Sequence, residues 1–367
     1  MCRITSRLQD AGFDERRCAD RLKSTGGIPN FAGRSIQRPY VRDGSDAADV
    51  AISLFLLNEP VKTDLICRLF DQTDLDSLFS MRLITADRGC LYAPVNLFPC
   101  NGIYIATDKR FAALSNPDIN PVMWLHPESY VLARVVDREV RVRHALDLCT
   151  GSGIHALLAA AHSDSVTGVD INPRAIAFSD FNRALNRLDN VEFVPGDLFA
   201  RTGSNQYDLI LANPPYNPDR VVYAAPNYWS GGASGEDILS RIISGLGMYL
   251  SNDGVCHIFT LLCHNRNGPT YKDKIDRWLD GRIAEYDVVA QVEPTHYRSA
   301  DPSFGAHLRS TFGFFEFGVL SFRKALDRTG SYYHGRPLST NPAPGLRPMV
   351  MNHSAFEVYR NNAGASC

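Results

Sequence analysis

Residues 145–155, with the sequence ALDLCTGSGIH, constrain the fold more than any other part of the chain. An apolar stretch there ends in a loop with two glycines, and a helix-like segment follows directly. Glycine is needed where backbone approaches a ligand with no Cβ in the way. The pattern predicts a buried strand, a nucleotide-contacting loop and a helix. A dinucleotide loop would carry a third glycine where Ala156 stands, and Asp147 would repel a pyrophosphate. That carboxylate instead suits a ligand with a cation beside the loop.

From about Leu125 to Arg323, strand and helix patterns alternate, which is typical of an open parallel sheet in an α/β domain. The predicted strands are 145–149, 165–170, 191–195, 207–212, 254–262 and 286–292. The predicted helices are 153–161, 173–188, 236–249 and 271–279. Two last apolar stretches, 311–316 and 319–322, are separated at Gly318, so we expect them to form an antiparallel hairpin at the sheet edge.

Three further predicted strands end in polar residues. Asp170 lies 17 residues after Gly153, where both oxygens of one carboxylate can bind a ribose diol. Asp197 ends the next strand and is placed to accept a hydrogen bond from an adenine amino group. Asn213 follows the fourth strand. Because the carboxyl ends of parallel strands meet at one edge of a sheet, we expect these residues and Asp147 to converge on one ligand.

This order of strand ends resembles the class I S-adenosylmethionine (SAM) dependent methyltransferases over roughly residues 120–323. The stretch Asn213-Pro214-Pro215-Tyr216 resembles a subgroup that methylates planar or amide nitrogens, including adenine-amino DNA, release-factor glutamine and ribosomal RNA guanine methyltransferases. Residues 170–175 (DINPRA) are typical of the glutamine and ribosomal branch. The resemblance implies a Rossmann-like, seven-stranded sheet with SAM as cofactor. It also implies these cofactor-binding residues: Asp147, Cys149, Gly151, Gly153, Asp170, Ile171, Asp197, Leu198 and Asn213.

The Asn-Pro-Pro-Tyr stretch has a chemical rationale. An amide or exocyclic amine has a delocalised lone pair, which a site can free by accepting both N–H groups. The Asn213 side-chain oxygen and the Pro214 carbonyl are the expected acceptors, and the two prolines stiffen the turn. Tyr216 is expected to stack on a planar substrate or to favour a methyl or sulfonium cation. We therefore expect Asn213, Pro214, Pro215 and Tyr216 to be catalytic, with positioning supplying most of the rate.

Residues 217–236 combine aromatic side chains with the run SGGASG at 230–235. This composition fits a flexible substrate lid and equally a surface loop packed on the core. The expected substrate contacts beyond the turn are Tyr130, Tyr223, Tyr228, Trp229 and Arg309. The histidines at positions 155, 257 and 264 are expected to be packed or capping residues rather than catalytic ones.

Four regions are expected along the chain: an N-terminal helical segment (1–45), a winged-helix-like accessory or substrate domain (46–118), the SAM-binding methyltransferase domain (119–325) and an irregular tail (326–367). In the second region, predicted helices at 47–57, 62–70 and 75–81 precede a hairpin of 83–85 and 90–95. This is the element order of a winged helix. Such a module binds DNA or covers a substrate, and the lack of a basic cluster on 62–81 disfavours DNA.

Composition narrows the class of protein. A formal net charge of −2 argues against holding nucleic acid by bulk electrostatics. The best apolar run, 50–57, is far shorter than the roughly 18 residues of a membrane helix, and no secretory signal is recognised. The nine cysteines form no C-x-x-C pair, so neither a zinc site nor a disulfide framework is indicated. A cytoplasmic enzyme without a metal is expected.

The acceptor stays open. The near-neutral charge and the aromatic lid candidate favour N-methylation of a small molecule or an amino-acid-type nitrogen. The motif subgroup favours an alternative, ribosomal RNA or a translation protein such as a release factor, supported by the basic residues at 3, 7, 16, 17, 21, 23, 34 and 38. A second alternative consumes SAM by attack on its aminopropyl carbon and releases methylthioadenosine. A non-enzymatic winged-helix regulator is disfavoured, because every strand-end residue is present.

Overall fold

The computed structural model describes residues 2–23, 45–109, 112, 119–125, 127–203, 205–219, 228–264, 268–281, 286–293, 314–324 and 331–337. Within these ranges the largest element is an eight-stranded sheet of order β13-β11-β12-β10-β9-β6-β7-β8. The strands are β6 (Val142–Leu148), β7 (Ser163–Asp170), β8 (Val191–Pro195), β9 (Tyr207–Ala212), β10 (Leu250–His264), β11 (Tyr286–Glu293), β12 (Phe314–Lys324) and β13 (Ser331–Pro337). The predicted α/β class is confirmed, with one strand more than the seven expected.

The sheet is parallel except for β12, which runs antiparallel between β10 and β11. Strand β6 pairs with β7 on one side and with β9 on the other, so the strand order reverses between β6 and β9. Ligands of open α/β sheets bind at such a reversal, outside the carboxyl ends of the strands. The topology therefore places a ligand site where the loops after β6 and β9 meet.

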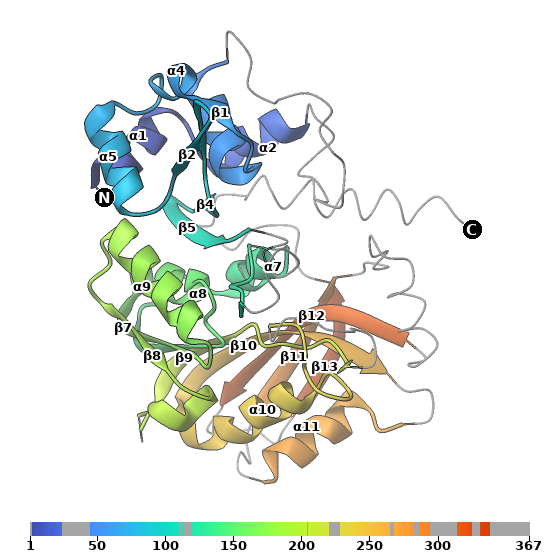
Figure 1. Ribbon diagram of the computed structural model, residues 1–367. Coiled ribbons are helices and arrows are strands. Elements are labelled where there is room, and N and C mark those ends of the chain that lie inside the picture. Colours follow the sequence, from blue (N-terminus) through green and yellow to red (C-terminus); the bar gives the residue numbers. More distant parts are fainter. Residues whose placement is uncertain are drawn as a thin grey trace.

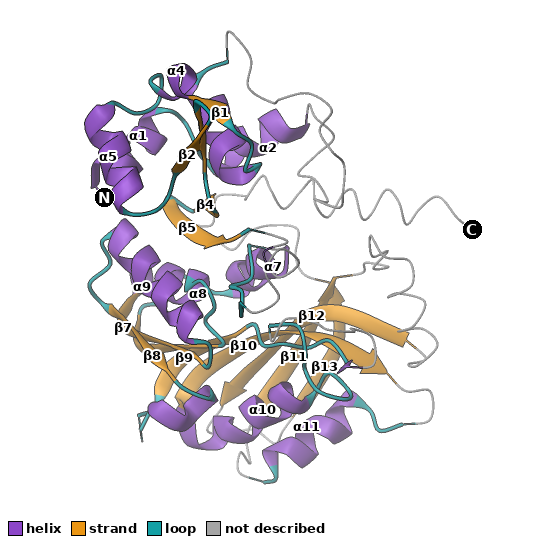
Figure 2. Ribbon diagram, in the orientation of Figure 1, coloured by secondary structure: helices purple, strands orange, loops and turns teal. Residues whose placement is uncertain are grey.

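Helices cover both faces of the sheet, which is why its central strands are apolar along their length (Figures 1 and 2). Leu209 and Leu211 of β9 belong to the core on one face, and Ile210 and Ala212 to the core on the other. The first face carries α7 (Pro127–Val135), α8 (Ile154–Ala159) and α9 (Pro173–Asn186); the second carries α10 (Asp237–Tyr249) and α11 (Tyr271–Leu279). None of the helices among the described residues is long and apolar enough to cross a membrane.

A smaller N-terminal unit lies beyond α9 in Figure 1. It begins with α1 (Cys2–Asp10) and α2 (Glu15–Lys23). The next elements are α3 (Ala47–Ala51), a π-helical turn η1 (Ile52–Leu56), β1 (Val61–Lys62), α4 (Thr63–Ile66), α5 (Gln72–Ser80), β2 (Thr85–Asp87) and β3 (Cys90–Tyr92). Their strands form a small sheet of order β1-β3-β2. Helices followed by a hairpin occur in the expected order, with β1 added before α4. A winged-helix-like domain over 46–118 stays a prediction.

Arginines of α1 and α2 are held by intramolecular ion pairs. Their partners are the aspartates that form the capping boxes at the starts of α3 and α5. Arg3 and Arg7 contact Asp71 and Asp74, and Arg17 and Arg21 contact Asp46 and Asp49. Four of the basic residues given as support for a ribosomal RNA or translation-protein acceptor therefore bind α1 and α2 to the rest of the N-terminal unit.

A second hairpin, β4 (Val95–Cys100) and β5 (Ile103–Asp108), was not predicted from the sequence. It joins the N-terminal unit to the large sheet through α9. Asn182 of α9 accepts from the Ala106 amide at 2.7 Å and donates to the Ala106 carbonyl at 2.9 Å. Asn186 makes the same pair of bonds with Tyr104. These side chains satisfy the backbone groups at the edge of β5, which would otherwise be buried unpaired.

Two predictions at the far edge of the sheet were wrong. Gly318 does not begin a hairpin turn but lies inside β12, paired with Thr260 of β10 and Val292 of β11. Two flanking strands hold it in an extended conformation, so its turn propensity is overridden. Strand β13 pairs in parallel with β11, within the region expected to be an irregular tail. Residues 311–313 of the expected hairpin lie outside the described residues.

Candidate active site

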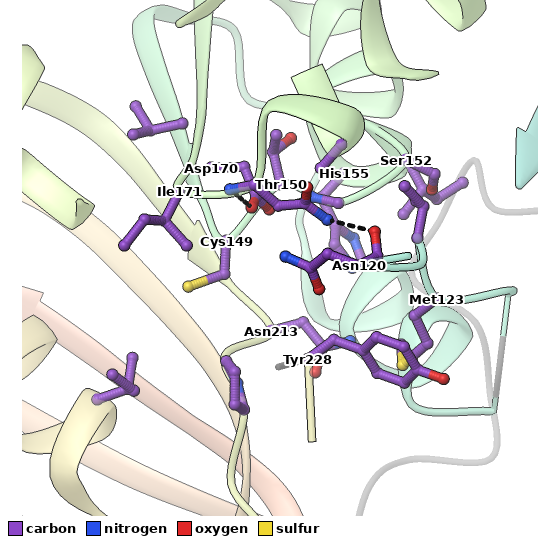
Figure 3. Close-up of a pocket in the computed structure, with 18 of the residues that line it drawn as sticks. Asn120, Met123, Cys149, Thr150, Ser152, His155, Asp170, Ile171, Asn213 and Tyr228 are labelled. Atoms are coloured by element: carbon purple, nitrogen blue, oxygen red, sulfur yellow. Dashed lines mark hydrogen bonds between the residues drawn. The ribbon is translucent and has the colours of Figure 1, made fainter. Parts of the chain in front are cut away.

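A cavity of about 240 Å³ lies at the carboxyl ends of β6, β7, β8 and β9 (Figure 3). It therefore occupies the position that the reversal of strand order predicts. Most of the residues expected at the site line it: Cys149, Gly151, Asp170, Ile171, Asp197, Leu198, Asn213, Pro215 and Tyr228.

The loop after β6 turns through left-handed backbone conformations. Cys149, Gly151 and Gly153 have φ values of 56°, 55° and 83°. A Cβ built on Gly151 would have no neighbour closer than the Cys149 carbonyl oxygen at 4.0 Å, so this glycine leaves space in the cavity. A Cβ on Gly153 would lie 2.8 Å from Phe193 and 2.9 Å from Ser179. Gly151 thus opens the cavity, whereas Gly153 permits close packing of α8 and does not line the cavity.

Asp147 lies behind this loop and does not line the cavity. Its Oδ2 accepts hydrogen bonds from Thr150 Oγ1 at 2.5 Å and from the Ala156 amide at 3.0 Å. Its Oδ1 is buried and has no hydrogen-bond partner among the described residues. Burial raises the pKa of this carboxyl to about 7, since a charge in an apolar surrounding is costly, and the nearby Asp170 adds to the effect.

Asp170 joins two of the loops that line the cavity. Its Oδ2 accepts from the Gly151 amide at 2.8 Å, and its Oδ1 accepts from the Asn172 amide at 2.9 Å. Burial raises its pKa, and the backbone hydrogen bonds partly oppose that rise. Each carboxylate oxygen has lone pairs for one more donor. The side chain therefore suits a ligand with two hydroxyl groups.

The loop after β8 brings Asp197 and Leu198 to the cavity, together with a residue that the sequence analysis missed. Arg241 of α10 also lines the cavity, and its guanidinium lies 2.7 Å from Asp197 Oδ2. This hydrogen bond and charge raise the pKa of Arg241. Arg241 lies 44 positions after Asp197 in the sequence, so no local pattern could predict this contact.

The segment 119–125 forms another wall that the sequence analysis missed; Asn120, Val122 and Met123 are among its lining residues. Asp108, at the end of β5, holds it in place. Asp108 Oδ2 accepts from the Val122 amide at 2.8 Å and from Arg174 Nε at 2.9 Å. Asn172 adds a hydrogen bond from its side-chain nitrogen to the Asn120 carbonyl at 3.0 Å (Figure 3). The unpredicted β4–β5 hairpin therefore helps to build the site.

The turn after β9 presents Asn213 and Pro215 to the cavity. Tyr216 is directed elsewhere, contrary to a stacking role in this structure. Its ring packs against Phe259 and Phe317 with ring centroids 5.7 and 5.9 Å apart, and its hydroxyl donates to Glu128 Oε1 at 3.1 Å. Tyr228 lines the cavity instead (Figure 3). Its ring packs edge to face against Trp124.

The other candidate residues have different locations. Tyr130 is buried in the core and does not line the cavity, whereas its neighbour Ser129 does, because α7 turns successive residues to different sides. Trp229 is partly exposed and lies outside the lining. Tyr223 and Arg309 lie outside the described residues.

Two of the histidines are buried, as expected. His257 is held by Ser321 Oγ at 2.8 Å, and burial lowers its pKa to about 4. His155 also lines the cavity, and burial lowers its pKa to about 3, so its ring is neutral near pH 7. The side chain of His264 is not described.

The fold and this edge of the sheet define a class I methyltransferase architecture, and comparison with known proteins agrees. Residues 124–258 match the methyltransferase small domain. A ribosomal protein uL3 glutamine methyltransferase of Bradyrhizobium diazoefficiens is 38% identical over 170 residues, which are 42% of this chain and 52% of that protein. A putative protein N5-glutamine methyltransferase of Methanocaldococcus jannaschii is 35% identical over 36% of this chain and 73% of its own length.

A release factor glutamine methyltransferase of Fusobacterium nucleatum is 43% identical over 82 residues, which are 22% of this chain and 23% of that protein. The chain spans about half the length of the first curated relatives that it matches. It belongs to the SAM-dependent methyltransferases, in the family of the methyltransferase small domain.

The residues at the cavity fit SAM, the cofactor of this class. The space beside Gly151 admits a ligand close to the loop. Burial raises the pKa of Asp147 to about 7, so this carboxyl is not a fixed negative charge near neutral pH, and the fit rests on the Gly151 space and on Asp170. Asp170 suits the two ribose hydroxyls, while Asp197 and Leu198 border the place expected for adenine.

Proposed function

We propose that this chain transfers a methyl group from SAM to the side-chain amide nitrogen of glutamine in a protein. The observation that carries the proposal is the position of the Asn213–Tyr216 turn: Asn213 and Pro215 line the same cavity as the Gly151 loop and Asp170. The names of the relatives support glutamine in a protein as the acceptor, since they describe glutamine methylation of ribosomal protein uL3 and of release factors. A translation protein as acceptor agrees with the expected cytoplasmic location.

The cavity residues divide into two groups in this proposal. Asp170, Ile171, Gly151, Asp197, Leu198 and the backbone of Cys149 hold the cofactor, while Asp147 and Gly153, which do not line the cavity, shape the loop from behind. Bound SAM supplies an electrophilic methyl group. Asn213 accepts one N–H of the glutamine amide on its side-chain oxygen and the Pro214 carbonyl accepts the other. This pair of hydrogen bonds turns the nitrogen lone pair toward the cofactor and excludes other orientations. The nitrogen–methyl bond forms as the sulfur–methyl bond breaks, S-adenosylhomocysteine is the leaving group, and the methylated nitrogen then loses one of its two protons to water.

A protein acceptor replaces the small-molecule reading as the better one. The printed names of the relatives describe glutamine methylation of proteins. The paired arginines of α1 and α2 no longer support either RNA or a protein acceptor, so the relatives' names carry this choice. Tyr228 lines the same cavity as Asn213 and offers a flat apolar surface along which a glutamine side chain would lie. Tyr216, tied to Glu128, orients the turn and does not stack on the acceptor.

The test incubates the purified chain with SAM and either ribosomal protein uL3 or a release factor, and maps methylation by mass spectrometry. We expect methylglutamine at a single site and release of S-adenosylhomocysteine that depends on the acceptor. The same acceptor with its glutamine changed to asparagine is the control and should stay unmodified. Turnover with RNA or a small amine alone would contradict the proposal, as would release of methylthioadenosine without an acceptor.

A further inference from the structure

The glycine-rich run after the Asn213–Tyr216 turn is packed against that turn. We call residues Tyr228–Gly235 the return, because this stretch brings the chain back to the end of β9. The Asn217 amide donates to the Trp229 carbonyl at 3.0 Å, and the Gly231 amide donates to the Asn217 carbonyl at 2.8 Å. Asn217 and Ser230 form a parallel bridge. The return is therefore paired with the backbone that follows Tyr216, which does not fit the flexible lid considered from the sequence.

Two glycines make this contact possible. A Cβ on Gly231 would lie 2.8 Å from the Pro215 carbonyl oxygen and 2.8 Å from Tyr216 Cα, both of them backbone atoms. A Cβ on Gly235 would overlap the Tyr216 carbonyl oxygen. A Cβ on Gly231 would also lie 2.7 Å from the Gly235 carbonyl oxygen of the return itself. Backbone cannot move aside as the end of a flexible side chain can, so a side chain at either position forces the turn and the return apart.

The return also connects the turn to the opposite wall of the cavity. Its first residues supply Tyr228 and Ser230 to the lining. Its last residues lead into α10, where the Asp237 amide donates to the Gly231 carbonyl at 2.9 Å. Ile238 and Arg241 of α10 line the cavity beside Asp197. One continuous stretch therefore borders both the turn and the place expected for adenine.

We propose that the return is a positioning element for the proposed reaction: Gly231 and Gly235 let its backbone press against the Asn213–Tyr216 turn and fix where the amide acceptors lie. Asn213 and Pro214 touch the acceptor in the proposed function, and the glycines act through them. Because misplacement of a reacting group by about 1 Å can cost about 10²-fold in rate, we expect a change at Gly231 to lower turnover far more than cofactor affinity.

The first test compares two alanine variants of the full chain. Gly231→Ala is expected to lower kcat for glutamine methylation by about 10²-fold and to change the Kd of S-adenosylhomocysteine less than about 3-fold. Gly245→Ala on α10 is the matched control, because its Cβ would overlap the Phe199 ring of the segment after β8 and no atom of the turn. It should lower Tm and leave kcat unchanged. Wild-type kcat in Gly231→Ala overturns the proposal, as does a loss of kcat that follows Tm in both variants.

A second measurement needs no acceptor, so it separates this proposal from the proposed function on which its rate test rests. In a crystal structure of Gly231→Ala, residues 213–216 should be displaced by roughly half an ångström or more, and in Gly245→Ala they should not move. If Gly231→Ala does not fold, hydrogen exchange on the wild-type protein decides. The amides of Asn217, Gly231 and Asp237 should exchange slowly. Exchange as fast as that of an unpaired loop overturns the proposal.

Discussion

The two halves of the cavity are built in different ways. The proposed cofactor side consists mainly of the ends of β6, β7 and β8, whose polar residues follow one another along the chain; Arg241 of α10 is the one distant addition named above. The proposed acceptor side gathers the Asn213–Tyr216 turn, the segment 119–125 and the return, which come from three separate parts of the sequence. The first half depends mostly on local strand-end chemistry and the second on long-range packing.

This difference has a physical origin. A nucleoside is recognised by backbone and carboxylate groups that a parallel sheet offers wherever its strands end. An acceptor must instead be held in one orientation, and that requires walls from several elements. Asp108 illustrates this requirement, because it fixes the 119–125 wall through Val122 and Arg174, which lie far from it in sequence. Substitutions on the cofactor side should therefore change affinity, and those on the acceptor side should change rate.

The largest expected effect tests the acceptor side. Asn213→Ala removes the side-chain oxygen that accepts an amide N–H, and we expect kcat to fall about 10³-fold, comparable to the loss of one preorganised hydrogen-bonding group in other enzymes. Calorimetry should find the Kd of S-adenosylhomocysteine changed by less than about 3-fold. Loss of cofactor affinity parallel to the loss of rate would show that the two halves are not separate.

The second prediction concerns pH, since Asp147 is buried with a pKa raised to about 7 from 3.8. The folded state holds the proton more tightly than the unfolded state, so this stabilisation is complete below about pH 4 and is lost as pH rises through about 7. Between about pH 5 and about pH 8 the free energy of unfolding should fall by about 2–3 kcal/mol from this group. Urea unfolding of the wild type and of Asp147→Asn at several pH values measures this fall in the free energy of unfolding. If the two proteins lose stability in parallel between these pH values, the prediction is wrong.

Cofactor affinity is tested next, with Asp170. Asp170→Ala removes hydrogen bonds to the Gly151 and Asn172 amides as well as the acceptors expected for the ribose. We expect the Kd of S-adenosylhomocysteine to rise about 30-fold, from the loss of about 2 kcal/mol. Asp164→Ala is the matched control, since Asp164 lies near the other end of β7 and pairs with exposed Arg141. An equal loss in both variants would assign the effect to the strand and not to the site.

The same division explains what could be predicted from the sequence. Strand ends carry local signals, so the positions of Asp170, Asp197 and Asn213 followed from spacing alone. The wall at 119–125 and Arg241 could not be predicted, because their place depends on contacts with Asp108 and Asp197 that no local pattern encodes. Glycine was the most ambiguous residue. A glycine in a sequence indicates flexibility, a turn or close packing equally well. Tertiary contacts determine which of these occurs: Gly231 packs closely against backbone, and Gly318 lies in an extended strand.

The smallest effect is expected at Cys149, which lines the cavity with φ of 56° although it carries a side chain. Such a conformation costs a non-glycine residue roughly 1 kcal/mol, while glycine loses about as much from its greater freedom in the unfolded chain. Cys149→Gly should therefore change the free energy of unfolding by less than about 1 kcal/mol. Cys149→Ala keeps the strain and serves as the control. The hydrogen bond from the Gly151 amide to Asp170 holds the loop in both variants. The Kd of S-adenosylhomocysteine should therefore change less than about 3-fold in each. A larger change in Cys149→Ala alone would mean that the thiol itself contacts the cofactor.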